Sequence, residues 1–164
     1  MPKTNGSILA RWQTTLEKVG CSPLEFYDRV KNSLLECELP NLLVSQITRN
    51  EGGWFSPRRV YLRIRCQRLY FDVSSFVVGN SLIAGWWLHL DSPGVGELLT
   101  ELPVLGFLME KTSRAATYYS VDYIEYAQHA VHDSILRVVD ELRAENDLTC
   151  LPGEARAPVW EEIR

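Results

Sequence analysis

The sequence predicts one α+β domain with N-terminal helices, a mostly antiparallel meander sheet of four or five strands, and a long C-terminal helix packed on one sheet face. Three observations predict this: helical spacing of apolar residues near the start, alternation of period two from Leu42 to Asp91, and an amphipathic stripe over residues 123–145. The chain has 164 residues, about the size of one domain. We therefore expect a single domain over residues 1–164, irregular at 1–6 and 148–164.

Two helices are expected before the sheet. Residues 7–20 have a possible cap in Ser7, a suitable stop in Gly20, and apolar residues at helical spacing: Ile8, Leu9, Trp12, Leu16 and Val19. A second helix opens at Ser22-Pro23-Leu24-Glu25, a capping box with proline at the first helical position. Its expected apolar face is Leu24, Tyr27, Val30 and Leu34, and Pro40 ends it.

Alternating residues predict strands at 42–49, 58–66, 68–76 and 82–90. The turn at Cys66-Gln67 has weak turn chemistry, whereas Gly52-Gly53 and Gly79-Asn80 are good turn formers. Residues 96–110 predict a short helix broken by Pro103, and residues 117–121 predict a fifth strand. Asp122 is the expected cap of the long helix at 123–145, and Val159 or Trp160 is expected to pin the tail to the surface.

Sorting the strand residues by alternation gives two unlike sheet faces. One face is apolar throughout and includes Trp86, which we expect in the core under the C-terminal helix. The opposite face is called here the aromatic–arginine face, and it consists of Tyr61, Arg63, Arg65, Tyr70, Asp72, Trp87 and His89. Aromatic and arginine side chains anchor many interfaces, so this face, with Arg59 beside it, is the candidate binding surface. The alternative is an ordinary wet face, with an arginine pairing Asp72 and Trp87 lying under the N-terminal helices.

Candidates for catalysis are weak. Glu125, His129 and His132 follow helical spacing and are a metal-ligand set in type, but a solvated helix flank explains them as well. Cys66 lies beside arginines but is expected on the core face as an inert thiol. Gly52-Gly53 and Gly94-Val95-Gly96 lack the context of a phosphate loop. No cofactor is expected.

Charge and cysteine content restrict the class of partner. The net charge of −4 disfavours a general nucleic-acid binder, although the arginine cluster between Arg58 and Arg68 leaves one possible. The four cysteines have no C-x-x-C spacing, which favours free thiols in a reducing compartment. The sequence has no signal peptide and no membrane span, so we expect a cytoplasmic protein with no membrane contact.

The leading hypothesis is a non-enzymatic interaction module or accessory subunit, which uses the aromatic–arginine face to bind a partner protein or a second copy. Two alternatives remain open. One is a metal-assisted hydrolase using Glu125, His129 and His132. The other is a binder of an anionic small molecule or single-stranded nucleic acid through Arg59, Arg63, Arg65 and Tyr61.

Overall fold

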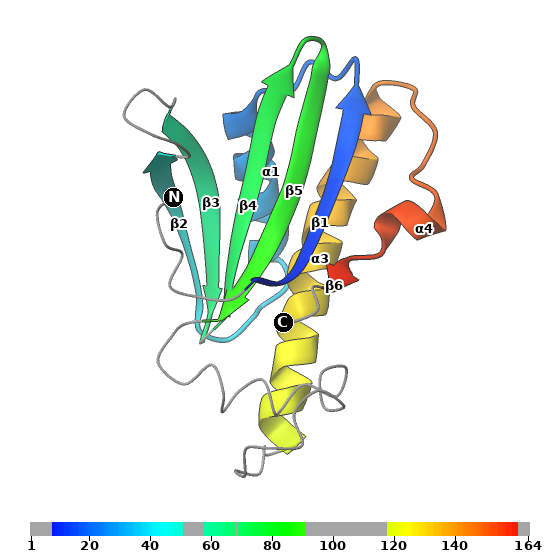
Figure 1. Cartoon of the computed structure of the whole chain (residues 1–164). Coiled ribbons are helices and arrows are strands. Elements are labelled where there is room, and N and C mark those ends of the chain that lie inside the picture. The colour runs from blue at the N-terminus through cyan, green and yellow to red at the C-terminus, as the bar shows by residue number, and fades with distance from the viewer. Residues whose placement is uncertain (1–7, 51–57, 68, 91–117, 161–164) are drawn as a thin grey trace.

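The computed structural model describes residues 8–50, 58–67, 69–90 and 118–160, and in these ranges an antiparallel sheet forms one layer and helices form the second (Figure 1). The sheet has six strands in the order β2-β3-β4-β5-β1-β6. The strands are β1 (Ile8–Glu17), β2 (Leu42–Asn50), β3 (Arg58–Cys66), β4 (Leu69–Val78), β5 (Ser81–Leu90) and β6 (Val159–Trp160). The helices are α1 (Pro23–Leu35), α3 (Tyr118–Glu145) and α4 (Gly153–Arg156).

The predicted meander is confirmed. Strands β2 to β5 pair in sequence order and all antiparallel, with bounds within two residues of the prediction. The weak turn at Cys66-Gln67 is made by Gln67 in the left-handed region, with a φ of 54°, and Gly79 has a φ of 61° in the β4–β5 turn. The alternating pattern of residues therefore predicts these strands well, even though Cys66-Gln67 is not a favourable turn sequence.

The helix predicted at residues 7–20 is wrong, because the segment forms strand β1. It pairs antiparallel with β5 on one side and with β6 on the other. Two features concealed the strand. Thr14 takes a core-facing position opposite Ala84, and an irregularity between Ile8 and Ala10 puts Leu9 and Ala10 both in the core. The resulting apolar spacing resembles a helix, and the sheet has six strands instead of four or five.

The capping box at Ser22 is confirmed. The Ser22 hydroxyl accepts a hydrogen bond from the Glu25 amide at 3.2 Å, and Pro23 occupies the first turn of α1. The helix ends at Leu35, earlier than Pro40. Its buried face also differs from the prediction, because Leu24 is 55% exposed whereas Phe26 is fully buried.

The long C-terminal helix is confirmed and starts earlier than predicted. Helix α3 begins at Tyr118, so the strand predicted at 117–121 is wrong, and Asp122 lies inside the helix instead of capping it. The aromatic and β-branched residues of this segment favour a strand only locally, and the amphipathic helix that follows extends through them. The broken helix predicted at 96–110 lies outside the described residues.

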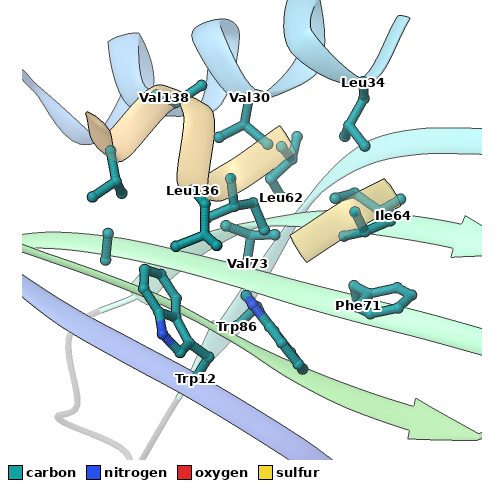
Figure 2. Close-up of a cluster of buried hydrophobic side chains, with 14 of the residues drawn as sticks. Trp12, Val30, Leu34, Leu62, Ile64, Phe71, Val73, Trp86, Leu136 and Val138 are labelled. Carbon is teal, nitrogen blue, oxygen red and sulfur yellow. The ribbon is translucent and has the colours of Figure 1, made fainter. Parts of the chain in front are cut away.

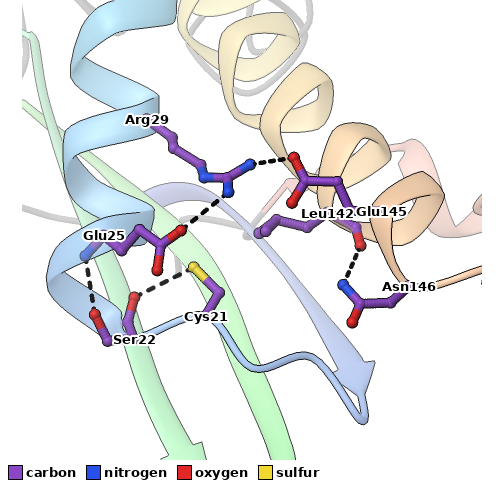
Figure 3. A network of polar contacts seen from close by, with 7 residues as sticks. All are labelled: Cys21, Ser22, Glu25, Arg29, Leu142, Glu145 and Asn146. Carbon is purple, nitrogen blue, oxygen red and sulfur yellow. Dashed lines mark hydrogen bonds and ion pairs between the residues drawn. The ribbon is translucent and has the colours of Figure 1, made fainter.

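One core lies between the sheet and the helices (Figure 2). Val30 and Leu34 of α1 and Leu136 and Val138 of α3 face the strand residues Leu62, Ile64, Phe71, Val73, Trp12 and Trp86. Trp86 is fully buried, as predicted. Between the helices, the Arg29 guanidinium donates to Glu25 of its own helix and to Glu145 of α3 (Figure 3). Hydrogen bonding to Glu145 and then to Glu25 raises the pKa of Arg29.

The C-terminal residues are partly regular rather than wholly irregular. The indole N–H of Trp12 donates to the Ala155 carbonyl in α4 at 2.8 Å, and Trp160 in β6 pairs with Ala10. His132 of α3 accepts from the indole N–H of Trp86 at 3.1 Å and contacts the Arg156 carbonyl at 2.7 Å. The tail is thus pinned near Trp160, as predicted. None of the described helices has the length and apolarity needed to cross a membrane.

Candidate partner-binding face

The sheet face that carries Trp87 lies opposite all three described helices. Helices α1 and α3 pack on the Trp86 side, and α4 bonds Trp12, whose strand partner is Trp86 (Figure 1). The alternative in which Trp87 lies under the N-terminal helices is therefore wrong. Trp87 itself is half-buried.

The register of the strands arranges the aromatic–arginine face in rows across the sheet. One row runs Leu43, Arg65, Tyr70 and His89. The next runs Ser45, Arg63, Asp72, Trp87 and Arg11, and a third runs Ile47, Tyr61, Ser74, Gly85 and Gln13. All seven predicted residues thus lie on the same side of the adjoining strands β3, β4 and β5.

A buried carboxylate organises the middle row. Asp72 is 3% exposed and accepts two hydrogen bonds of 2.7 Å from Arg63, one to each oxygen. Arg49 of β2 approaches the same carboxylate at 3.2 Å, and the Nε2 of His89 lies 3.7 Å away. Burying a carboxylate costs free energy because the charge loses its hydration. The two hydrogen bonds from Arg63 and the nearby charge of Arg49 offset this cost, which would remain uncompensated for a buried carboxylate without partners. The pairing of Asp72 with an arginine, which the wet-face alternative predicted, is confirmed for Arg63.

His89 stands at the margin of this network. Its pKa is lowered by burial, a shift that the Asp72 carboxylate opposes and that Arg49 and Arg63 reinforce. Its Nδ1 is buried and has no hydrogen-bond partner in the described part of the chain. The neutral ring is the form that suits this environment.

Aromatic rings and arginines stack over the rest of the face. Tyr61 meets Trp87 edge to face, with 6.3 Å between ring centroids. The Tyr70 ring lies between Arg63 and Arg65, 5.2 and 5.4 Å from their guanidinium carbons. Arg59 lies over Phe76 at 4.7 Å. These contacts hold the aromatic rings and guanidinium groups in fixed positions. Their side chains therefore lose less conformational entropy when a partner binds.

Not every predicted site residue is accessible. Tyr61, Asp72 and His89 are buried, and Arg63 is occupied by Asp72. The accessible groups are the exposed Arg65 and Arg59, and the half-buried Tyr70 and Trp87. The residues of this face that sequence reasoning missed include Arg49, Arg11 and Leu43, and Leu43 is 60% exposed. Extending the alternation to residues 42–49 would have found Arg49 and Leu43, whereas Arg11 was hidden by the mistaken helix.

Charge divides between the two layers. Arginines at positions 11, 49, 59, 63 and 65 lie on the Trp87 face, where the described strands carry only the carboxylates of Asp72 and Glu17. Helix α3 on the other side has Arg137 and Arg143 against the acidic residues Glu125, Asp133, Asp140, Glu141 and Glu145. In a chain with a net charge of −4, the described strands thus carry more basic than acidic side chains on the Trp87 face.

The predicted metal-ligand set is not assembled. Glu125 and His129 are exposed, whereas His132 is buried with both ring nitrogens in contact with Trp86 and Arg156. No group of three histidine, cysteine or acidic side chains suited to a metal ion occurs among the described residues. Cys66 is fully buried, and burial raises the pKa of its thiol to about 11, so the core location is confirmed. The glycine pairs and Arg68 lie outside the described residues.

Comparison of the chain with protein-family models, with curated proteins and with solved structures found no match.

Proposed function

We propose that this protein is a non-enzymatic interaction module that binds an acidic partner protein through the aromatic–arginine face. The observation that carries the proposal is the concentration of arginine and aromatic side chains on the sheet face that no described helix covers. The accessible part, from Leu43 across Arg65 to Tyr70, combines an exposed apolar side chain, a guanidinium and a ring. Interface anchors have this composition.

The buried network supports the proposal through rigidity. Asp72 fixes Arg63 by two short hydrogen bonds, and Arg63 in turn lies over Tyr70. A ring held in this way presents a preformed surface, so little conformational entropy is lost on docking. Arginines favour carboxylate partners because the guanidinium can form two parallel hydrogen bonds, and the acidic helix layer would repel the same partner from the opposite side.

The test uses exposed side chains, because removing Arg63 would leave a buried carboxylate without its partner. Arg65→Glu and Tyr70→Ala change the accessible surface, and Lys31→Glu on α1 is the control with the same charge reversal on the helix side. Proteins that co-purify with the tagged chain from its native cells would be identified, and the affinity of each purified candidate measured by calorimetry. We expect Arg65→Glu to weaken binding roughly tenfold or more, with Lys31→Glu near wild type.

Two controls separate the alternatives. Sedimentation of wild type and Arg65→Glu tests whether the partner is a second copy, in which case the variant loses a dimer that the wild type forms. A single-stranded oligonucleotide, titrated at two salt concentrations, tests the nucleic-acid alternative, which requires binding that falls steeply with salt. Unchanged partners and unchanged mass in both face variants would contradict the proposal.

A further inference from the structure

Strands β3 and β4 separate at one end, and a pocket opens there. Their pairing stops at Tyr61 and Ser74, although β3 begins at Arg58 and β4 continues to Val78. The Tyr27 hydroxyl of α1 occupies the gap, donating to the Val60 carbonyl and accepting from the Ser75 amide, both at 2.8 Å. The pocket has a volume of about 380 Å³ and is lined by Ser22, Pro23, Leu24, Tyr27, Arg58, Arg59, Val60, Tyr61, Ser74, Ser75 and Phe76. It is called here the α1 pocket.

We propose that the α1 pocket binds a small organic carboxylate that carries a short apolar body. This site goes beyond the partner-binding face, since the pocket lies at the gap between β3 and β4 beside the start of α1. Arg59 and Tyr61 also lie on that face, but Leu43, Arg65 and Tyr70 do not line the pocket.

Positive potential converges on the pocket from two directions. The N-terminus of the 13-residue helix α1 lies in its wall, and the first backbone N–H of that helix belongs to Leu24 because Pro23 has none. Arg58 and Arg59 enter from β3, and both are exposed. By alternation with the core residues Leu62 and Ile64, Arg58 lies on the helix side of the sheet. Helix N-termini and arginines together are a common setting for carboxylates.

A buried hydroxyl independently points to a ligand. Ser75 is 7% exposed, and its Oγ has no hydrogen-bond partner in the described part of the chain. Ser75 pairs with the core residue Ala84, so its side chain projects to the helix side, where it lines the pocket. A buried polar group without a partner costs free energy, and a ligand oxygen in the pocket would satisfy it.

None of the described residues that line the pocket is acidic. Glu25, the nearest acidic residue along α1, is held by Arg29 at 2.9 Å, and Arg29 also bonds Glu145 (Figure 3). Four of the lining residues are apolar: Pro23, Leu24, Val60 and Phe76. Leu24 was predicted to lie in the core, but its side chain is 55% exposed and forms part of the pocket wall. Apolar walls around a few polar groups favour an amphipathic carboxylate over inorganic phosphate, which has no apolar part to bury.

The probe is 3-phenylpropionate, titrated into the whole protein and followed by amide NMR shifts and calorimetry. Its neutral amide is the matched control ligand, and inorganic phosphate tests whether any anion suffices. We expect saturable shifts at Leu24 and Ser75, with the amide and phosphate each binding roughly tenfold more weakly. Equal affinity for the amide, equal affinity for phosphate, or no saturable shift at these amides would overturn the proposal.

Variants locate the site. Arg58→Ala removes an exposed guanidinium, so the fold is retained, and it should weaken 3-phenylpropionate binding roughly tenfold. Ser75→Ala should weaken it about threefold or more by deleting the unpaired hydroxyl, while Arg65→Ala, on the aromatic–arginine face, should leave it unchanged. Loss of binding in Arg65→Ala with retention in Arg58→Ala would place the carboxylate on the other face and contradict the assignment.

Discussion

Gly85 lies where strand β5 leaves no room for a side chain beside β1. A side-chain carbon at this position would lie 2.5 Å from the Trp12 carbonyl oxygen and 3.2 Å from the Gln13 Cα. These are backbone atoms of a paired strand, so they cannot move aside without disturbing the ladder. Gly85→Ala should therefore lower the free energy of unfolding by about 1–3 kcal/mol.

Urea denaturation of Gly85→Ala measures this loss, and Gly20→Ala is the matched control, because a side-chain carbon at Gly20 meets nothing within 4 Å. The control should stay within about 0.5 kcal/mol of wild type. Equal stabilities for the two variants would show that β1 adapts to the added methyl group.

His132 makes stability depend on pH. Burial lowers the pKa of His132, a shift that the hydrogen bond to Arg156 and the charge of Asp133 oppose and that His129 and Arg156 reinforce by their charges. The unfolded chain therefore takes up a proton near the ordinary pKa of about 6.5 while the folded ring stays neutral. Its contribution to stability is fully present above that pH and is lost as the pH falls below it. Protonation would also remove the acceptor for the Trp86 indole.

The melting temperature of wild type should thus fall between about pH 7 and pH 5 more steeply than that of His132→Gln. His129→Gln is the control, since His129 is exposed on the same helix. A wild-type slope in His132→Gln would mean that another group, such as His89 with its lowered pKa, governs the response.

At the scale of elements, a single hydroxyl joins α1 to the sheet. Tyr27 is 1% exposed, and its oxygen bonds one strand on each side of the β3–β4 gap. Burial raises the pKa of Tyr27, against the opposing effect of its bond to Ser75, so the hydroxyl stays protonated and available as a donor. Tyr27→Phe leaves the Ser75 amide and the Val60 carbonyl without this partner and should cost about 1–3 kcal/mol.

The comparison for Tyr27→Phe is Tyr126→Phe, which removes the same atom from a side chain that is 54% exposed on α3. Chemical denaturation should separate the two variants clearly. If they match, water replaces the hydroxyl in the gap at no cost.

The strands that the sequence predicts well have apolar residues at successive core-facing positions. In β3 these are Leu62, Ile64 and Cys66, and in β5 they are Leu82, Ala84, Trp86 and Leu88. The sequence did not predict β1 as a strand because Thr14 lies on the core side and the neighbouring residues 9 and 10 are both buried. The first turn of α3 was predicted as a strand because the tyrosines in it have a local preference for strands. Alternation also placed the aromatic–arginine face correctly but could not show that Asp72 is buried or that Arg49 reaches it, since both depend on how the strands pack.

At the scale of the whole molecule, the two layers have different electrostatic characters. Among the described residues, basic side chains gather on the Trp87 face of the sheet, and acidic ones gather on α3. A partner with a carboxylate-rich surface would be oriented before contact, so its association rate should depend on salt more than its dissociation rate does. The α1 pocket was outside the reach of sequence reasoning, because it exists only where two paired strands part around a tyrosine from a distant helix.

The position of β1 between β5 and β6 also sets an order of events during synthesis. The β2–β5 meander joins neighbours in the chain and can form as each hairpin leaves the ribosome. Strand β1, which is made before the meander, cannot pair until its main partner β5 has been made about seventy residues later. Its second partner, β6 at Val159–Trp160, is made later still. Until then its apolar side chains, Trp12 and Leu16 among them, have no sheet to join. The apolar side chains of the β1 segment therefore stay without their sheet partner until β5 has been made, a state that favours aggregation during synthesis.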